Sequence, residues 1–133
     1  MKYVWSRKSL FLLNQLHPDL RRVVFRAFSY DVMDITVLQT LRMLEEQKAN
    51  LAKGVSATLK SKHLMQPSGY AHAVDLAPYP IDWNDTKRYG VMMGLMAAAA
   101  KEEGVNMRMG GNWDGDNDFR DNKPEDPGHF ELA

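Results

Sequence analysis

Apolar residues recur at helical spacing in two long stretches of the chain. The first stretch follows Pro18, which suits the first position of a helix, and its apolar residues are Leu20, Val23, Val24, Ala27 and Phe28. In the second, Asn84 can cap a helix that runs to about Glu103 and ends at Gly104. The buried side of this second helix is expected to carry Met92, Met93, Leu95, Met96 and Ala99. Shorter helices are predicted at residues 10–16 and 44–53, and Gly54 ends the latter.

Shorter apolar runs between these helices predict strands. They are residues 35–41, 71–77, 105–109 and 129–132. Residues 56–69 lack a helical period and carry a Pro-Ser-Gly turn, so an extended arm leading into a loop is expected there. The pattern predicts an α+β fold, in which helices pack on one side of a small antiparallel sheet.

Length and composition narrow the class of protein. A chain of 133 residues with 44% hydrophobic content fits one domain over residues 1–133. Basic and acidic residues number 17 each and the pI is about 6.9, so no basic surface for nucleic acid is expected. The chain contains no cysteine, which excludes a disulfide framework, a thiolate metal site and a cysteine nucleophile.

The beginning of the sequence, MKYVWSRKSLFLLNQLHPDL, does not read as a signal peptide. Its apolar run is interrupted by Asn14, Gln15, His17 and Asp19 before a cleavage site can form. No apolar run approaches the roughly 20 residues of a membrane span. We therefore expect a protein that is made in the cytoplasm, does not insert into a membrane and is a monomer.

Two histidines and two aspartates supply the chemistry of a catalytic zinc site. His63, Asp75 and His129 offer two imidazoles and a carboxylate for one metal ion, and Asp126 is a spare acid beside them. Catalytic zinc commonly takes three such protein ligands and keeps a fourth position for water, whose proton a nearby carboxylate can accept. If His63 and Asp75 lie on adjacent antiparallel strands and His129 on a third, the three can converge.

Other residues compete for these roles. His72 lies three residues before Asp75, and along a regular strand that odd offset sends the two side chains to opposite faces, which favours His63. His17 precedes Pro18, where helix capping or surface exposure is the simpler explanation. Asp126 stands on a Pro-Gly turn and is either the spare acid or an ordinary turn residue. Glu131 shares a face with His129, so it is either a hydrogen-bond partner of that ligand or a surface residue.

The motifs SKH, AVDLAPY, IDWND, GGNWDGD and DPGHFEL, in this order, resemble a known family. It is the phage endolysin branch of the zinc peptidases, which include D-Ala-D-Ala carboxypeptidases and L-alanyl-D-glutamate endopeptidases. The resemblance runs from about Thr36 to Leu132. It implies a hedgehog or D-Ala-D-Ala peptidase-like fold, with the zinc site on the sheet.

The resemblance also implies roles for individual residues. His63, Asp75 and His129 hold zinc, and Asp126 is the general base. Arg42 binds substrate or stabilises the developing oxyanion, a task that suits a permanently charged guanidinium. Ser61 corresponds to a serine near the active site, with a role in substrate binding.

Two positions depart from the family's pattern. The interval from His63 to Asp75, twelve residues, is longer than in most relatives, so the loop between them is expected to be enlarged. Thr40 stands where relatives tend to have glycine, two residues before Arg42.

The implied activity is zinc-dependent hydrolysis of the L-Ala–D-Glu amide bond in the peptide stem of peptidoglycan. Such an endolysin stays in the host cytoplasm until holin lesions release it to the cell wall, and no separate wall-binding domain is expected. Two alternatives stay open. One is a D-Ala-D-Ala carboxypeptidase with the same site, and the other is a module that binds zinc or wall peptide without cleaving it.

A second metal site is suggested by the polar loop at residues 110–125. Asp114, Asp116 and Asp118 alternate along it, and such oxygen ligands suit Ca²⁺. The loop lacks the full EF-hand pattern, and a solvated acidic loop is the alternative.

Overall fold

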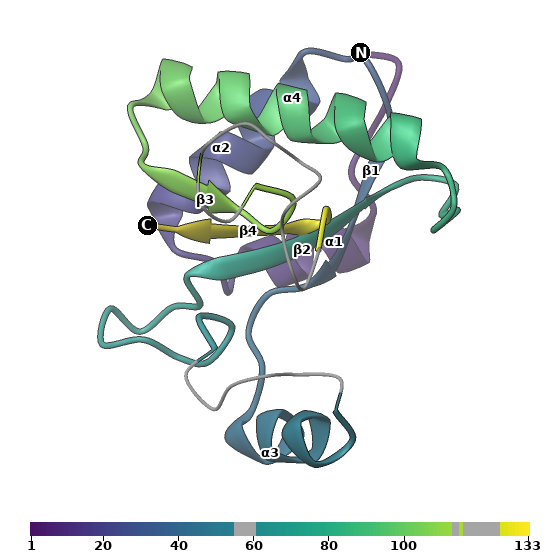
Figure 1. Cartoon of the computed structure of the whole chain (residues 1–133). Helices are drawn as coiled ribbons and strands as arrows, with labels where there is room; N and C mark the ends of the chain where they lie inside the picture. Colours follow the sequence, from purple (N-terminus) through teal and green to yellow (C-terminus); the bar gives the residue numbers. More distant parts are fainter. Residues whose placement is uncertain (55–60, 113–114, 116–125) are drawn as a thin grey trace.

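The computed structural model describes residues 1–54, 61–112, 115 and 126–133 (Figure 1). In chain order its elements are α1 (Arg7–Leu13), α2 (Pro18–Ser29), β1 (Ile35–Gln39), α3 (Leu44–Ala52), β2 (Ala73–Pro78), α4 (Thr86–Glu103), β3 (Met107–Met109) and β4 (His129–Leu132). None of the helices in these described ranges is both long and apolar enough to cross a membrane.

The two long helices form where apolar periodicity predicts them. The buried residues of α2 are the same five that its sequence pattern indicates. Those of α4 are Tyr89, Met92, Met96, Ala99 and Ala100, while Met93 and Leu95 are only partly buried. Figure 1 shows α2 and α4 side by side over one face of the sheet.

Helix boundaries differ from the prediction where a cap was misassigned. The N-cap of α4 is Asp85 rather than Asn84, because the Asp85 carboxylate accepts a hydrogen bond from the Arg88 N–H at 3.2 Å. The first helix begins at Arg7 rather than at residue 10, because the Ser6 hydroxyl accepts from the Ser9 N–H. His17 caps α2 through its ring Nδ1, as the capping interpretation expected.

Among the described residues, four antiparallel strands form a sheet in the order β1-β2-β4-β3. The α+β prediction is confirmed, and β4 has the predicted bounds. The strand predicted at residues 105–109 begins only at Met107, because the Val105 N–H caps the end of α4 through the Ala100 carbonyl. The strand predicted at residues 71–77 begins at Ala73, because the His72 N–H bonds instead to the Lys62 carbonyl.

A β-bulge interrupts the pairing of β1 with β2. Val37 pairs with Leu76, but the next pair is Gln39 with Asp75, so Leu38 has no partner in the register. One extra residue in a strand shifts which face each following side chain occupies. The bulge therefore places Gln39 on the same face as Asp75.

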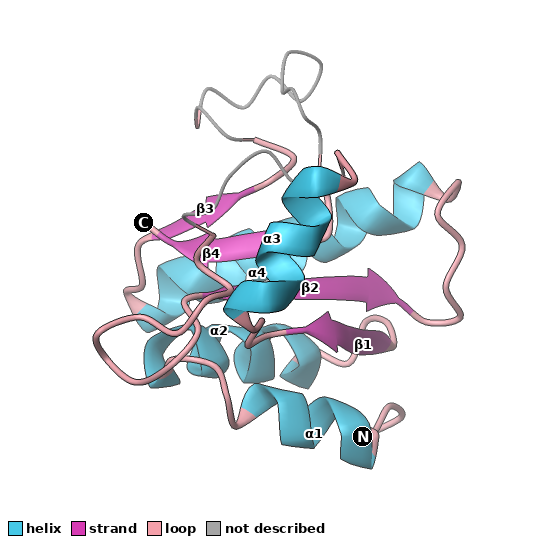
Figure 2. Cartoon of the chain, turned by 90° about the horizontal axis from the view of Figure 1, so that it is seen from below, coloured by secondary structure: helices cyan, strands magenta, loops and turns pink. Residues whose placement is uncertain are grey.

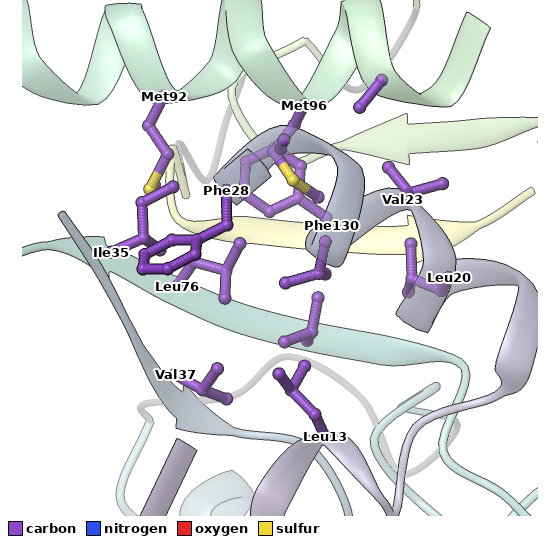
Figure 3. Close-up of a cluster of buried hydrophobic side chains, with 14 of the residues drawn as sticks. Leu13, Leu20, Val23, Phe28, Ile35, Val37, Leu76, Met92, Met96 and Phe130 are labelled. Carbon is purple, nitrogen blue, oxygen red and sulfur yellow. The ribbon is translucent and has the colours of Figure 1, made fainter. Parts of the chain in front are cut away.

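Alternation along β2 and β4 divides their side chains between two faces. Val74, Leu76 and Phe130 belong to the hydrophobic core, and Figure 3 shows Leu76 and Phe130 with Met92 and Met96. Asp75 and His129, which occupy the intervening positions and pair directly, face the other way. Helix α3 lies on this opposite side, in front of the sheet in Figure 2. The face away from the core is thus the one that carries the polar residues.

We expect Phe130→Ala to destabilise the protein strongly. Phe130 is 0% exposed, lies on the central strand β4 and pairs with Val74 and Met109. Removing its ring should cost about 3–5 kcal/mol of the free energy of unfolding, through lost burial and a residual cavity. Urea denaturation followed by circular dichroism measures this. A loss below about 1 kcal/mol, the usual range for a surface site, would show that Phe130 does not anchor the core.

Candidate metal centre

Three donor residues converge on the polar face of the sheet. One ligand atom from each of His63, Asp75 and His129 lies within 4.8 Å of the other two. Asp75 Oδ1 is 3.2 Å from His63 Nε2 and 3.1 Å from His129 Nδ1. Within the described ranges this is the single His, Cys, Asp or Glu cluster with the geometry to hold a metal ion.

The sheet places two of these residues and a turn places the third. Asp75 and His129 are direct partners across β2 and β4. The expectation that His63 lies on a strand adjacent to Asp75 is wrong, because His63 belongs to a turn. Its carbonyl accepts from the Arg42 N–H at 2.8 Å, which attaches the turn just beyond the end of β1. The long interval of twelve residues between His63 and Asp75 therefore does not prevent the two side chains from meeting.

The surroundings of His63 leave one ring nitrogen directed to the centre. Its Nδ1–H donates to the Thr40 carbonyl at 2.7 Å. The residue is only 2% exposed, so its Nε2 is buried. This nitrogen faces Asp75 Oδ1 but makes no hydrogen bond with the described residues. A buried polar atom without a partner is costly, and coordination of a metal ion would satisfy it. Thr40 itself is fully buried, and its hydroxyl donates to the Leu12 carbonyl.

His129 is oriented in the same way by an acidic neighbour. Its Nε2–H donates to Glu131 Oε1 at 2.9 Å, which leaves Nδ1 for the centre. Glu131 is only 7% exposed, and its other oxygen is 3.5 Å from Lys62 Nζ and 3.6 Å from an Arg108 nitrogen. The contact between Glu131 and His129 that their spacing of two residues suggested is therefore present. Each imidazole has one nitrogen fixed by the protein and the other turned toward Asp75.

The charges of the centre reinforce one another. Burial alone would raise the pKa of Asp75, but the hydrogen bond from His129 and the nearby ring of His63 hold it well below its ordinary value. Burial alone would lower the pKa of His129, but Asp75 and Glu131 raise it to about 9. Asp75 is therefore ionised at neutral pH and ready to bind a cation.

Asp126 lies beside this group without joining it. Together with Asp75 it lines a cavity of about 300 Å³ whose apolar wall includes Leu38, Trp83 and Tyr89. Desolvation by the surrounding protein, followed by the charge of Asp75, raises the pKa of the Asp126 carboxyl. The raised pKa makes the carboxylate a better proton acceptor than an ordinary surface aspartate.

Backbone contacts hold the turn that carries Asp126. Its N–H donates to the Gly110 carbonyl at 3.1 Å, and its carbonyl accepts from the His129 N–H at 3.1 Å. A Cβ at Gly110 would collide with the Asp126 carbonyl, so only glycine allows this approach. The position of Asp126 is thus tied to both β3 and β4.

Arg42 approaches the centre from the end of β1. Its Nη2 is 4.0 Å from Asp75 Oδ2, and its side chain is largely buried. Two glutamines, Gln39 and Gln47, accept hydrogen bonds from its guanidinium. Neither glutamine was identified from the sequence, because a single glutamine in a strand or a polar helix carries no motif.

The remaining predicted residues lie in different places. The Ser61 hydroxyl accepts from the His63 N–H at 3.1 Å, so Ser61 shapes the turn that carries His63. His72 is outside the cluster, and its Nε2 is 2.7 Å from the Ser68 hydroxyl. The proposed calcium ligands Asp114, Asp116 and Asp118 lie outside the described residues.

We expect Glu131→Gln to weaken metal binding without abolishing it. The amide can still accept from His129, but the charge-assisted hydrogen bond is lost, and changes of this kind cost about tenfold to a hundredfold in affinity. Isothermal titration with zinc measures the effect, and Glu102→Gln, on an exposed residue of α4, is the matched control. Equal zinc affinity in the Glu131 variant and the wild type would mean that Glu131 does not support the centre.

Known proteins resemble this chain over its full length. Residues 1–133 match a protein family described as phage L-alanyl-D-glutamate peptidase. The L-alanyl-D-glutamate peptidase of Escherichia phage T5 is 31% identical over 142 residues, which cover 100% of both chains. The crystal structure of the Serratia marcescens L-Ala D-Glu endopeptidase ChiX is similar, with a TM-score of 0.81 and 30% sequence identity over 98% of this chain and 90% of that one.

Proposed function

The chain belongs to the phage L-alanyl-D-glutamate peptidase family, and from this premise we propose that it is a zinc-dependent peptidoglycan hydrolase. Its substrate is the peptide stem of the bacterial cell wall, and the bond that it cleaves is the amide between L-Ala and D-Glu. The family and both similar proteins support the peptidase activity. The metal and the individual residue roles are argued below from the centre itself.

One observation carries the proposal of zinc. His63 Nε2 and His129 Nδ1 both point at Asp75 Oδ1, and each ring is fixed from behind by a hydrogen bond to its other nitrogen. Two imidazoles, each without a proton on the coordinating nitrogen once the metal binds, and one carboxylate suit zinc, and three protein ligands leave a coordination position open for chemistry. The buried Nε2 of His63 without a hydrogen-bond partner fits a metal ligand better than a structural histidine.

When bound, the metal ion would act as a Lewis acid on the scissile carbonyl and lower the pKa of the attacking water. Asp126 accepts a proton from that water and passes it to the nitrogen of the departing D-Glu, so the broken amide yields a carboxylate and an amine. Arg42 donates hydrogen bonds to the oxygen on which negative charge develops. The cavity that Asp75 and Asp126 line is a place for the peptide stem beside the general base and one of the metal ligands.

Mass spectrometry of digested muropeptides tests the proposal. The purified zinc-loaded protein should convert stem peptides into a fragment that ends in L-Ala and a fragment that begins with D-Glu. Release of free D-Ala alone would instead identify a D-Ala-D-Ala carboxypeptidase. Intact muropeptides that bind without any cleavage would identify a binding module, and both results would refute the proposed reaction.

The place of action follows from the substrate. We propose that the protein acts on the cell wall, which it reaches from the host cytoplasm through holin lesions, and that it does so as a monomer. The family and the phage relative support action on the wall. The release route and the oligomeric state are predictions from the sequence.

A further inference from the structure

Helix α3 contributes one buried side chain, and that side chain contacts Arg42. Gln47 is 0% exposed and is the buried residue of α3, whose other side chains are exposed or partly exposed. Its Oε1 accepts a hydrogen bond from Arg42 Nη1 at 2.5 Å. Figure 2 shows α3 on the side of the sheet that carries the metal centre. The hydrogen bond between Gln47 and Arg42 therefore joins this helix to the site. It is unusual for the buried contact of a helix to be an amide side chain, because apolar side chains normally provide this contact.

A second glutamine reaches the same guanidinium from the sheet. The β-bulge sets Gln39 opposite Asp75, and Gln39 Oε1 accepts from Arg42 Nε at 3.0 Å and from Nη2 at 2.6 Å. The Gln39 amide nitrogen in turn donates to Glu46 of α3 at 3.1 Å. Three N–H groups of Arg42 are thus engaged by two amide oxygens.

The two glutamines fix the orientation of the Arg42 guanidinium without placing a negative charge against it. An arginine has five N–H donors in a rigid plane, so three fixed hydrogen bonds define the orientation of the whole group. Amide oxygens carry no net charge, whereas a carboxylate in the same place would pair with the guanidinium and weaken its attraction for other anions. Both glutamines therefore preserve the positive charge close to Asp75.

We propose that Gln47 is a positioning residue for Arg42, and that its neutral amide orients the guanidinium for the developing oxyanion without adding a second carboxylate, besides Asp75, next to its charge. The inference rests on the proposed function and assigns part of that function to α3. Gln47 is not one of the three donor residues and does not line the cavity, whereas its side chain bonds to Arg42, so we assign its effect to Arg42.

Two variants separate orientation from charge. Gln47→Met keeps the length of the side chain and removes the acceptor. Gln47→Glu keeps an acceptor and adds a negative charge. In the zinc-loaded full-length chain, both should lower kcat on purified muropeptides, by up to about a hundredfold for the loss of positioning, with little change in KM or zinc content. Lys48→Met, an exposed neighbour on α3, is the matched control and should keep wild-type kcat.

A coupling experiment distinguishes positioning from a purely structural role. If Gln47 acts through Arg42, Gln47→Met should add little to the loss already caused by Arg42→Lys. A structural role would lower the melting temperature and add its loss to that of Arg42→Lys. Nitrogen-15 NMR of the guanidinium supplies a readout without substrate, because the Arg42 Nη–H signals should shift and broaden in Gln47→Met but not in Lys48→Met.

The outcomes separate this inference from the proposed function. Wild-type kcat in Gln47→Met would overturn the positioning role, and wild-type kcat in Gln47→Glu would overturn the need for a neutral amide. If Gln47→Met fails to fold, kcat and the Arg42 Nη–H signals of Gln47→Glu still decide. If the wild-type protein cleaves no muropeptide, the proposed function fails, while an unchanged Arg42 signal in the variants would independently refute the contact.

Discussion

Asp126→Asn is expected to leave zinc bound and to abolish most peptidoglycan cleavage. The carboxylate of Asp126 lies outside the three-residue cluster, so its replacement removes no ligand. An amide of the same shape cannot accept the proton of the attacking water. General-base catalysis typically contributes about 10²- to 10⁴-fold, and kcat on muropeptides should fall by that amount. Metal analysis and muropeptide kinetics on the same preparation measure both halves of the prediction.

The result for Asp126 needs a control for charge alone. Glu102→Gln removes one negative charge from the exposed end of α4 and should change neither zinc content nor kcat. Full activity in the Asp126→Asn protein would remove this residue from the mechanism. Loss of zinc from the same variant would instead make Asp126 a ligand.

His63→Ala is expected to lose both the metal and the activity. The substitution removes the buried Nε2 that faces Asp75 and leaves two of the three donor atoms. Removal of a ligand should lower zinc affinity by more than the roughly tenfold to hundredfold that loss of a supporting hydrogen bond costs. Isothermal titration with zinc, followed by muropeptide digestion at saturating zinc, measures the two losses separately.

His72→Ala is the matched control for this experiment. His72 is a histidine of the same loop region, but it contacts Ser68 and lies outside the cluster. Its replacement should leave zinc affinity and cleavage unchanged. Stoichiometric zinc of wild-type affinity in His63→Ala, or loss of zinc in His72→Ala, would show that the wrong histidine was assigned to the centre.

Local patterns were sufficient for the elements that bury one apolar face. The five buried residues of α2 follow directly from helical periodicity, and β4 was bounded correctly. Boundaries failed where a single hydrogen bond decides between neighbours, as with Asp85 rather than Asn84 at the start of α4. The bulge at Leu38 could not be predicted, because it depends on pairing with a strand distant in the sequence.

The chemistry of the site was easier to predict than its construction. His63, Asp75 and His129 were selected as donor types and through the family resemblance, and the structure brings them together. Their convergence, however, depends on a turn at His63 that is held by Thr40 and Arg42 rather than on a strand. Gln39 and Gln47 were missed, since their importance comes only from the arginine that they contact.

The division of β2 and β4 into two faces has a practical consequence for protein engineering. Substitutions that improve packing around Val23, Met92 and Met96 act on the side of the sheet opposite to the donor residues. Heat tolerance could therefore be raised by redesigning that side while the proposed metal centre keeps its geometry. Residues of the strands themselves should be left unaltered in such a redesign, since a displacement of Phe130 would be transmitted directly to its neighbour His129.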